Sequence, residues 1–145
     1  MASSTEQGKP PINTIAMLGR AYSLLGFRIV DGVIGAGYPQ KPKHSAVFAQ
    51  LGPDGARLTE LARRAGMTPQ AMGELVDELE QLDYVRRDPD PADRRAKVVR
   101  LTPLGVKVIA AGERVIVGIE DDISARLGPE GHAELRRLLE QLLSD

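Results

Sequence analysis

The sequence predicts a mainly α-helical fold that carries one small β-hairpin. Apolar residues recur at three- and four-residue steps in long segments near both ends of the chain, which is the pattern of amphipathic helices. Between these segments lie two short stretches with helix-capping residues, followed by two β-branched arms joined by a turn rich in Pro and Asp. Aromatic residues make up only 3% of the chain, so its core must consist mainly of Leu, Val, Ile and Ala.

Composition indicates one domain and argues against several kinds of chemistry. The chain has 145 residues, of which 42% are hydrophobic, enough for a single core. It contains no Cys and only two His, so we expect no thiol chemistry, no metal site and no cofactor. No apolar run approaches the roughly 20 residues that cross a bilayer, and the N-terminus lacks the apolar core of a signal peptide. We expect a cytoplasmic protein without a membrane partner, with residues 1–11 as a disordered arm and residues 12–145 as one domain.

The net charge of -1 hides a polarised distribution. Residues 86–100 contain six basic and three acidic side chains, whereas residues 113–145 contain eight acidic side chains and four arginines. A basic region can attract an anionic partner even when the whole chain is close to neutral. A nucleic-acid contact is therefore expected in the middle of the chain.

The first predicted helix covers residues 12–36. Seven apolar residues at helical spacing form one of its faces, namely Ile12, Ile15, Leu18, Tyr22, Leu25, Ile29 and Val33. Glycine and proline within residues 35–42 end this helix, and residues 43–51 are predicted to form a short second one.

Residues 59–82 carry the signals of two short helices joined by a turn. Thr59 is suited to cap the first helix, and Gly66 is suited to the left-handed conformation that ends it. Thr68 can cap the second helix, with Pro69 at its first position. Two short helices joined in this way are typical of a helix-turn-helix.

The stretch RRDPDPADRRAKVVRLT, residues 86–102, predicts a β-hairpin with arginines at its tip. Asp93 stands two residues before Arg95 and is expected to pair with it. Arginines on such a tip can enter a narrow minor groove of DNA, while the basic residues beside them neutralise phosphates. Because only one or two residues separate the hairpin from the preceding helix, the two features together predict a winged helix-turn-helix.

Two further helices are predicted after the hairpin. Thr102 and Pro103 repeat the combination of a cap and a proline that starts a helix. A long helix then runs to Gly128 and Pro129, and a last helix continues to residue 143. The predicted fold is thus a winged helix-turn-helix flanked by N- and C-terminal helices.

Each part of the DNA-binding interpretation has a simpler alternative. At the start of the second short helix, Gln70 is suited to bind adenine and Ala71 to contact a thymine methyl group in the major groove. The same segment could be a well-capped surface helix, and the hairpin could be a solvated charged turn. The two features occur together more rarely than either occurs alone, and their combination favours DNA binding.

Residues 41–105 resemble the winged helix-turn-helix of the MarR family of bacterial transcriptional regulators. DPADRRAKVVRLTPLG, residues 90–105, follows the wing pattern of that family, and LTELARRAGMTPQAMGELVDELEQLDYVRR, residues 58–87, follows its two DNA-binding helices. The resemblance implies a repressor that binds double-stranded DNA. It implies a major-groove edge made of Thr68, Pro69, Gln70, Ala71, Gly73 and Glu74, and wing contacts from Asp93, Arg94, Arg95 and Lys97.

Two features depart from the family pattern. Asp83 stands where the family usually has Gly, but Asp tolerates the left-handed conformation better than most residues. Glu74 and Asp77 are acidic, whereas recognition helices of the family often carry Arg or Lys near residue 74. The alternative therefore stays open that the chain is a winged-helix protein-interaction module that has lost specific DNA binding.

The terminal helices predict a homodimer. Residues 12–36 and 103–143 carry more apolar surface than a small winged helix can cover, although a larger monomeric core is the alternative. A twofold dimer places two recognition helices about one helical turn of DNA apart, which predicts a palindromic operator. The expected dimerisation residues are Ile12, Ile15, Leu18, Ile116, Ile119, Leu135, Leu138 and Leu142.

The resemblance also implies a small aromatic or phenolic effector that releases the repressor from DNA. Aromatic surface beside a cation suits an aromatic acid, so the candidate ligand residues are Tyr22, Arg28, Tyr38, His44 and Phe48. Each of these residues could equally belong to the core or the surface. The chain has no Ser/His/Asp set, no phosphate-binding Gly loop and no thiol, so we expect no catalytic residues and no enzyme activity.

Overall fold

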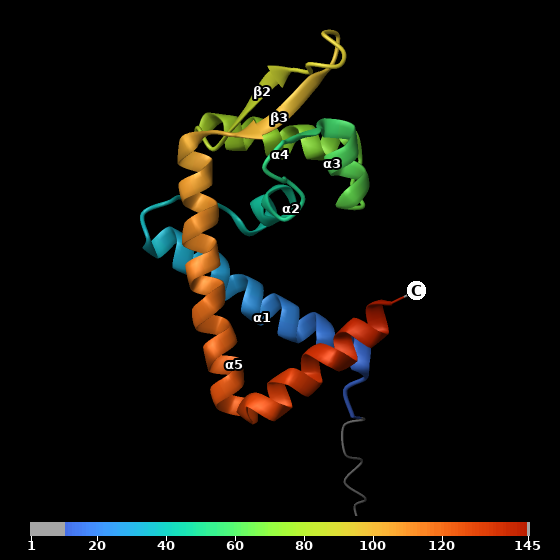
Figure 1. The fold of residues 1–145 in the computed structure, drawn as a ribbon, viewed down its shortest axis with the longest axis vertical. Coiled ribbons are helices and arrows are strands. Elements are labelled where there is room, and N and C mark those ends of the chain that lie inside the picture. Colours follow the sequence, from blue (N-terminus) through green and yellow to red (C-terminus); the bar gives the residue numbers. More distant parts are fainter. Residues whose placement is uncertain (1–10, 145) are drawn as a thin grey trace, which may run out of the picture.

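The computed structural model describes residues 11–144, so the predicted disordered arm lies almost wholly outside the described residues. The predicted fold class, mainly helical with a small hairpin wing, is confirmed (Figure 1). No helix within residues 11–144 is long and apolar enough to cross a membrane. In chain order the elements are α1 (Thr14–Gly35), η1 (Pro42–His44), α2 (Ser45–Phe48), β1 (Ala56–Arg57), α3 (Leu58–Arg64), α4 (Pro69–Gln81), β2 (Val85–Pro89), β3 (Lys97–Leu101) and α5 (Pro103–Leu143).

Helices α1 and α5, the two longest elements, cross and pack against each other (Figure 1). Asn13 caps α1, because its side chain accepts a hydrogen bond from the backbone amide of Ala16 at 2.9 Å. At the crossing, a Cβ added to Gly32 would lie 2.5 Å from Cγ2 of Val115. The missing side chain of Gly32 therefore lets the two helices approach closely.

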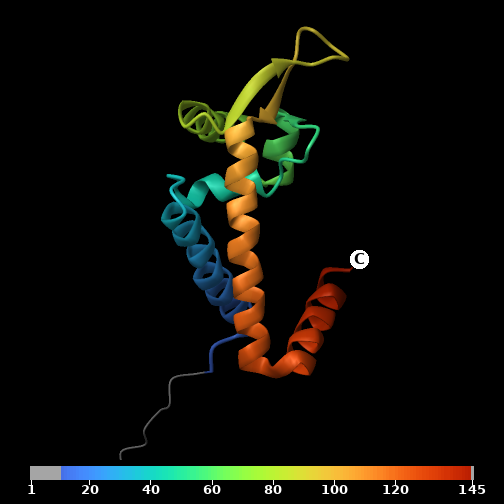
Figure 2. The same cartoon turned by 60° about the vertical axis from the view of Figure 1, so that its left-hand side comes forward.

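Helix α5 is broken at Gly128, which has φ 75° and ψ 158° and is followed by Pro129. The predicted break at these two residues is confirmed. In Figure 2 the segment after the break turns back from the long arm of α5 and forms a V with it. Inside this bend, Nε2 of His132 lies 2.8 Å from Oε2 of Glu120.

The wing contains a third strand that the sequence did not predict. The antiparallel sheet has the order β1-β3-β2, in which Ala56 of β1 and Arg87 of β2 both pair with Val99 of β3. Strand β1 has only two residues, which is too short for the alternating pattern on which strand prediction depends. Tertiary pairing with β3 therefore creates this strand.

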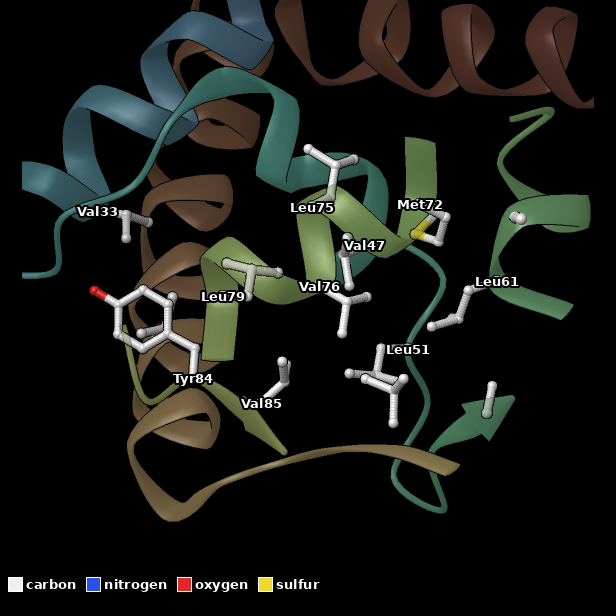
Figure 3. Packing of buried hydrophobic residues seen from close by; sticks show 14 of the residues in the cluster. Val33, Val47, Leu51, Leu61, Met72, Leu75, Val76, Leu79, Tyr84 and Val85 are labelled. Carbon is white, nitrogen blue, oxygen red and sulfur yellow. The ribbon is translucent and has the colours of Figure 1, made fainter. Parts of the chain in front are cut away.

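The core lies between the helix-turn-helix and the sheet (Figure 3). Tyr84, in the turn between α4 and β2, closes one side of it, and its hydroxyl donates a 2.7 Å hydrogen bond to the carbonyl of Pro39. This bond ties the end of α4 to the segment that follows α1. The fully buried side chains at the centre of the core include Val47, Leu61, Met72, Val76 and Leu79.

Local start and stop signals were predicted correctly with one exception. Gly66 and Asp83 have positive φ values of 64° and 60°, as expected. The expected Thr59 cap is wrong, because α3 already begins at Leu58 and Arg57 occupies the cap position without a side-chain bond. Arg57 is also the last residue of β1, so the helix starts where strand pairing ends.

Candidate nucleic-acid interface

The start of α4 exposes a small polar edge. Thr68 accepts a 3.1 Å hydrogen bond from the backbone amide of Ala71, and Pro69 takes the first helical position, as predicted. On the opposite side, Met72 and Leu75 are buried in the core (Figure 3). Six residues were predicted to form the major-groove edge. Four of them are exposed, namely Thr68, Pro69, Gln70 and Glu74. The other two, Ala71 and Gly73, are half-buried.

Gly73 stands on this edge although packing within the chain does not require a glycine. A Cβ added there would meet only Cδ2 of Leu58, at an ordinary 3.9 Å. Glycine inside a helix destabilises it by about 0.5–1 kcal/mol relative to Ala. Packing within the described residues therefore does not explain why this position is a glycine.

We expect Gly73→Ala to separate stability from DNA binding. The free energy of unfolding should rise by about 0.5–1 kcal/mol because Ala favours the helix. Affinity for operator DNA should fall, because the added methyl group holds the helix away from the groove. Urea denaturation and fluorescence anisotropy measure the two effects. Gly118→Ala, also in an open helical position, should stabilise the fold without weakening DNA binding; an unchanged DNA affinity in Gly73→Ala would contradict the close approach.

The tip of the wing is organised by its aspartates. Asp90 accepts a 2.8 Å hydrogen bond from the backbone amide of Ala92 and pairs with Arg57 at 2.7 Å. Asp93 accepts a 3.0 Å hydrogen bond from the backbone amide of Arg95. Asp93 thus contacts Arg95 through its backbone amide and not through its side chain, because the short Asp side chain reaches the amide two residues on and forms a local turn. The guanidinium of Arg95 stays available.

Basic side chains at the base of the wing are paired, whereas those at its tip are not. Arg86 lies 2.9 Å from Asp88, and Arg87 lies 2.9 Å from both Asp77 and Glu80. Within residues 11–144, no carboxylate lies within 4.0 Å of the side-chain nitrogens of the three predicted wing cations, Arg94, Arg95 and Lys97. The tip therefore presents positive charge to solvent, at the end of the molecule opposite the bend of α5 (Figures 1 and 2).

Most carboxylates of α4 are held by cations of this chain. Arg87 of β2 lies 2.9 Å from both Asp77 and Glu80. Glu78 is bound by the segment before α2, as described below. Glu74 is exposed, and within residues 11–144 no cationic side chain lies within 4.0 Å of its carboxylate. The acidic character of the helix is therefore largely neutralised, except at Glu74.

His44 connects the end of α1 to α4. Its ring is 1% exposed, and its Nδ1 accepts a 3.1 Å hydrogen bond from the backbone amide of Lys41. Nε2 must then carry the proton and donate to Oε2 of Glu78 at 2.8 Å. Lys43, at 2.6 Å, and this donation by His44 lower the pKa of Glu78 to about 2. We call this contact of Lys41, Lys43 and His44 with Glu78 the Glu78 clasp.

The Glu78 clasp predicts a defined pH dependence of stability. Because the pKa of Glu78 is lowered from 4.5 to about 2, its ionised form stabilises the fold above pH 4.5, and this contribution is lost as the pH falls towards 2. At neutral pH, Glu78→Gln should therefore be less stable than the wild type, and the difference should shrink across this range. Thermal denaturation from pH 7 to pH 2 measures it. Glu74→Gln, which loses no ion pair, serves as the control, and a difference that is the same at pH 7 and pH 2 would refute the assignment.

A cavity with a volume of about 420 Å³ lies between α1, α2 and α5. Only two of the predicted ligand residues, Tyr22 and Phe48, line it. Its polar lining consists of Gln40, Ser45 and Glu113, which sequence reasoning missed. The remaining lining residues are Leu25, Gly26, Ile29, Val33, Ala49, Val108, Ile109, Gly112 and Ile116.

The other three predicted ligand residues do not line this cavity, and each has other contacts. Arg28 forms an ion pair with Asp122 of α5. His44 belongs to the Glu78 clasp, and Tyr38 packs against the core. The helical spacing of Leu25, Ile29 and Val33 was a usable signal for the cavity wall, but that spacing does not distinguish a cavity from a core.

Seven of the eight residues predicted for dimerisation are exposed in the single chain. Ile15 is the extreme case, with 83% of its surface accessible. Ile119 differs, because it is only 5% exposed. It lies one turn after Val115, which packs on Gly32, and so it faces the interior of the chain. Ile119 is therefore unavailable to a partner in this arrangement.

Comparison with known proteins gives concordant matches. A family model described as the MarR family matches residues 41–96. An HTH-type transcriptional repressor of Mycobacterium tuberculosis is 34% identical over 91 residues, which are 63% of this chain and 66% of that protein. The solved structure of a Mycobacterium tuberculosis MarR family protein in complex with p-aminosalicylic acid is similar with a TM-score of 0.67 and 26% identity, over 92% of this chain and 100% of that chain.

The transcriptional repressor CouR bound to a 23-mer DNA duplex also has the same fold. Its TM-score is 0.71 at 23% identity, over 91% of this chain and 93% of that chain. The likeness extends from the helix-turn-helix to the terminal helices, because nearly the whole of both chains is covered. The sequence and fold matches agree: residues 41–96 match the MarR family, and the described residues adopt the winged-helix fold found in a solved protein of that family.

Proposed function

We propose that this protein is a transcriptional regulator that binds double-stranded DNA with the start of α4 and the tip of the wing. The observation that carries the proposal is that both features are exposed and lie at the same end of the molecule, as the positions of α4 and the wing in Figures 1 and 2 show. The capped start of α4 suits a major groove roughly 12 Å wide, and the unpaired tip arginines suit the minor groove beside it. The relatives named as repressors support the same function.

The charge distribution supports DNA rather than a protein as the partner of this surface. Asp77, which suggested a protein-interaction module, is bound by Arg87 and is therefore neutralised within the chain. Arg94 and Arg95 keep their charge free for phosphates and for the minor groove. On α4, Glu74 is the one acidic residue that no cation within residues 11–144 approaches within 4.0 Å.

The proposed functional unit is a homodimer that binds a palindromic operator. Exposed apolar side chains gather on the first half of α1 and on the segment of α5 after the break, including Ile15, Leu18, Leu135, Leu138 and Leu142. Water-exposed apolar surface of this extent is typical of an interface. Figure 2 shows that the segment after the break leaves the body of the chain, so its leucines are open to a second copy.

A small, largely apolar effector in the cavity between α1, α2 and α5 would control this dimer. An aromatic molecule fits a volume of about 420 Å³ with Tyr22 and Phe48 in its lining. The segment that supplies Ser45 and Phe48 to the cavity also carries the Glu78 clasp on α4. Movement of this segment on ligand binding would shift α4 and change the spacing of the two recognition helices, which would release DNA.

Fluorescence anisotropy with palindromic duplexes from the region upstream of the gene tests the proposal. We expect sequence-selective binding that weakens by roughly 1000-fold between 50 and 200 mM salt, as for a protein that neutralises several phosphates. Binding that is weak and indifferent to both sequence and salt would contradict the proposal and favour a protein-interaction module. Analytical ultracentrifugation of the same sample tests the dimer.

A further inference from the structure

We propose that Glu74 accepts a hydrogen bond from the N4 amino group of a cytosine in the major groove, and so determines one position of the operator. This inference rests on the proposed DNA-binding function and adds a specificity-determining residue to it. The acidic residue at this position is thereby an element of sequence recognition rather than an obstacle to DNA binding.

Glu74 lies on the face of α4 that would meet the bases in the proposed DNA complex. It follows Gln70 by four residues and therefore shares its face of the helix. Side chains of a helix lean towards its N-terminus, which directs the Glu74 carboxylate towards the exposed start of α4. Gly73 beside it leaves the backbone uncovered, so the helix can approach the floor of the groove.

The charge of Glu74 needs an explanation because the other acidic residues of α4 form ion pairs and Glu74 does not. Asp77 and Glu80 share Arg87, and Glu78 is held by the clasp. Glu74 is exposed, and no cation within residues 11–144 lies within 4.0 Å of it. A free carboxylate on a DNA-facing helix is repelled by phosphates and weakens binding to every sequence. Recognition of a particular base offsets this cost at the correct operator alone.

The hydrogen-bonding groups of the major groove select the base. An ionised carboxylate can only accept hydrogen bonds, so its partner must be a donor. The donors in the major groove are the amino groups of cytosine and adenine, whereas guanine and thymine present acceptors to it. Adenine places the acceptor N7 beside its amino group, which repels the second carboxylate oxygen. Cytosine is therefore the base that Glu74 accommodates without repulsion.

Selection from a library of random-sequence duplexes tests the proposal with the full-length protein. The wild type is expected to select a cytosine at one position of each half-site, with a preference of about 10-fold or more over the other bases. Glu74→Gln should shift this position to adenine, because an amide both donates and accepts and so matches N6 and N7. Glu74→Ala should show no preference there. The preferences at all other positions should stay the same in the three proteins.

A modified base identifies the atom that is contacted. N4-methylcytosine places a methyl group where the major-groove N–H of cytosine stands, so it should weaken binding of the wild type about 10-fold and leave Glu74→Ala unaffected. If Glu74→Gln binds all sequences more tightly but keeps the wild-type preferences, the carboxylate acts by repulsion alone and the proposal is refuted. If the wild type selects no sequence at all, the proposed function itself fails and this inference fails with it.

Discussion

Replacing both Arg94 and Arg95 with Ala is expected to lower affinity for operator DNA by about 100-fold or more, without changing the fold or the oligomeric state. These side chains have no carboxylate partner within residues 11–144, so their removal breaks no ion pair of the protein. Each lost contact in a DNA groove costs about 1–3 kcal/mol, and a dimer loses the contacts of two wings. The slope of log affinity against log salt should also become shallower by about 1 for each lost phosphate contact.

Anisotropy titrations over a salt series, combined with ultracentrifugation, measure this result. Arg136→Ala with Arg137→Ala is the matched control, because it removes the same charge from neighbouring positions at the other end of the molecule. Those two arginines pair with Glu120 and Glu134 on α5. Equal losses of affinity in the two double variants would mean that total charge, and not the wing, governs DNA binding.

Gly105→Ala is expected to be the most destabilising of the substitutions considered, with a loss of about 3 kcal/mol of unfolding free energy. Gly105 is buried in the first turn of α5, where an added methyl group would overlap the backbone carbonyl oxygen of Tyr84. That carbonyl accepts a 3.0 Å hydrogen bond from the amide of Thr102, so it is fixed where α5 joins the wing. A backbone atom cannot rotate away as a side chain can, and the junction must distort.

Urea denaturation followed by circular dichroism measures this loss. Gly118→Ala places the same methyl group on an open part of the same helix, where no atom lies within 4 Å, and should be neutral or stabilising. If Gly105→Ala were as stable as Gly118→Ala, the junction between Tyr84 and α5 would not constrain the fold.

The helix boundaries were predictable because their signals are local. Thr68 caps α4, Thr102 caps α5, and Gly128 with Pro129 breaks the last helix, all as expected from neighbouring residues. The family pattern likewise identified the wing from one continuous stretch. Strand β1 escaped prediction because it exists only through pairing with β3, more than forty residues later in the chain.

The candidate sites were also predictable to different degrees, because some depend on residues close together in the sequence and others on the packing of distant elements. The exposed edge at the start of α4 follows from the capping and periodicity of a single helix. The cavity does not, since it forms where α1, α2 and α5 meet, and Arg28 and His44 turn out to be used in contacts elsewhere. The exposure of the predicted dimerisation residues also depends on tertiary packing. Ile119 is buried within the chain, whereas the other seven residues are exposed.

The amino-acid sequence by itself determined the order and ends of the helices, the wing and the position of the arginines at its tip, because these depend on interactions between residues a few positions apart. Tertiary structure alone decided which charges remain free. Lys43 reaches Glu78 across 35 residues and Arg28 reaches Asp122 across 94. Such pairs form only when distant elements pack, and within residues 11–144 they leave Arg94, Arg95, Lys97 and Glu74 without an ion-pair partner.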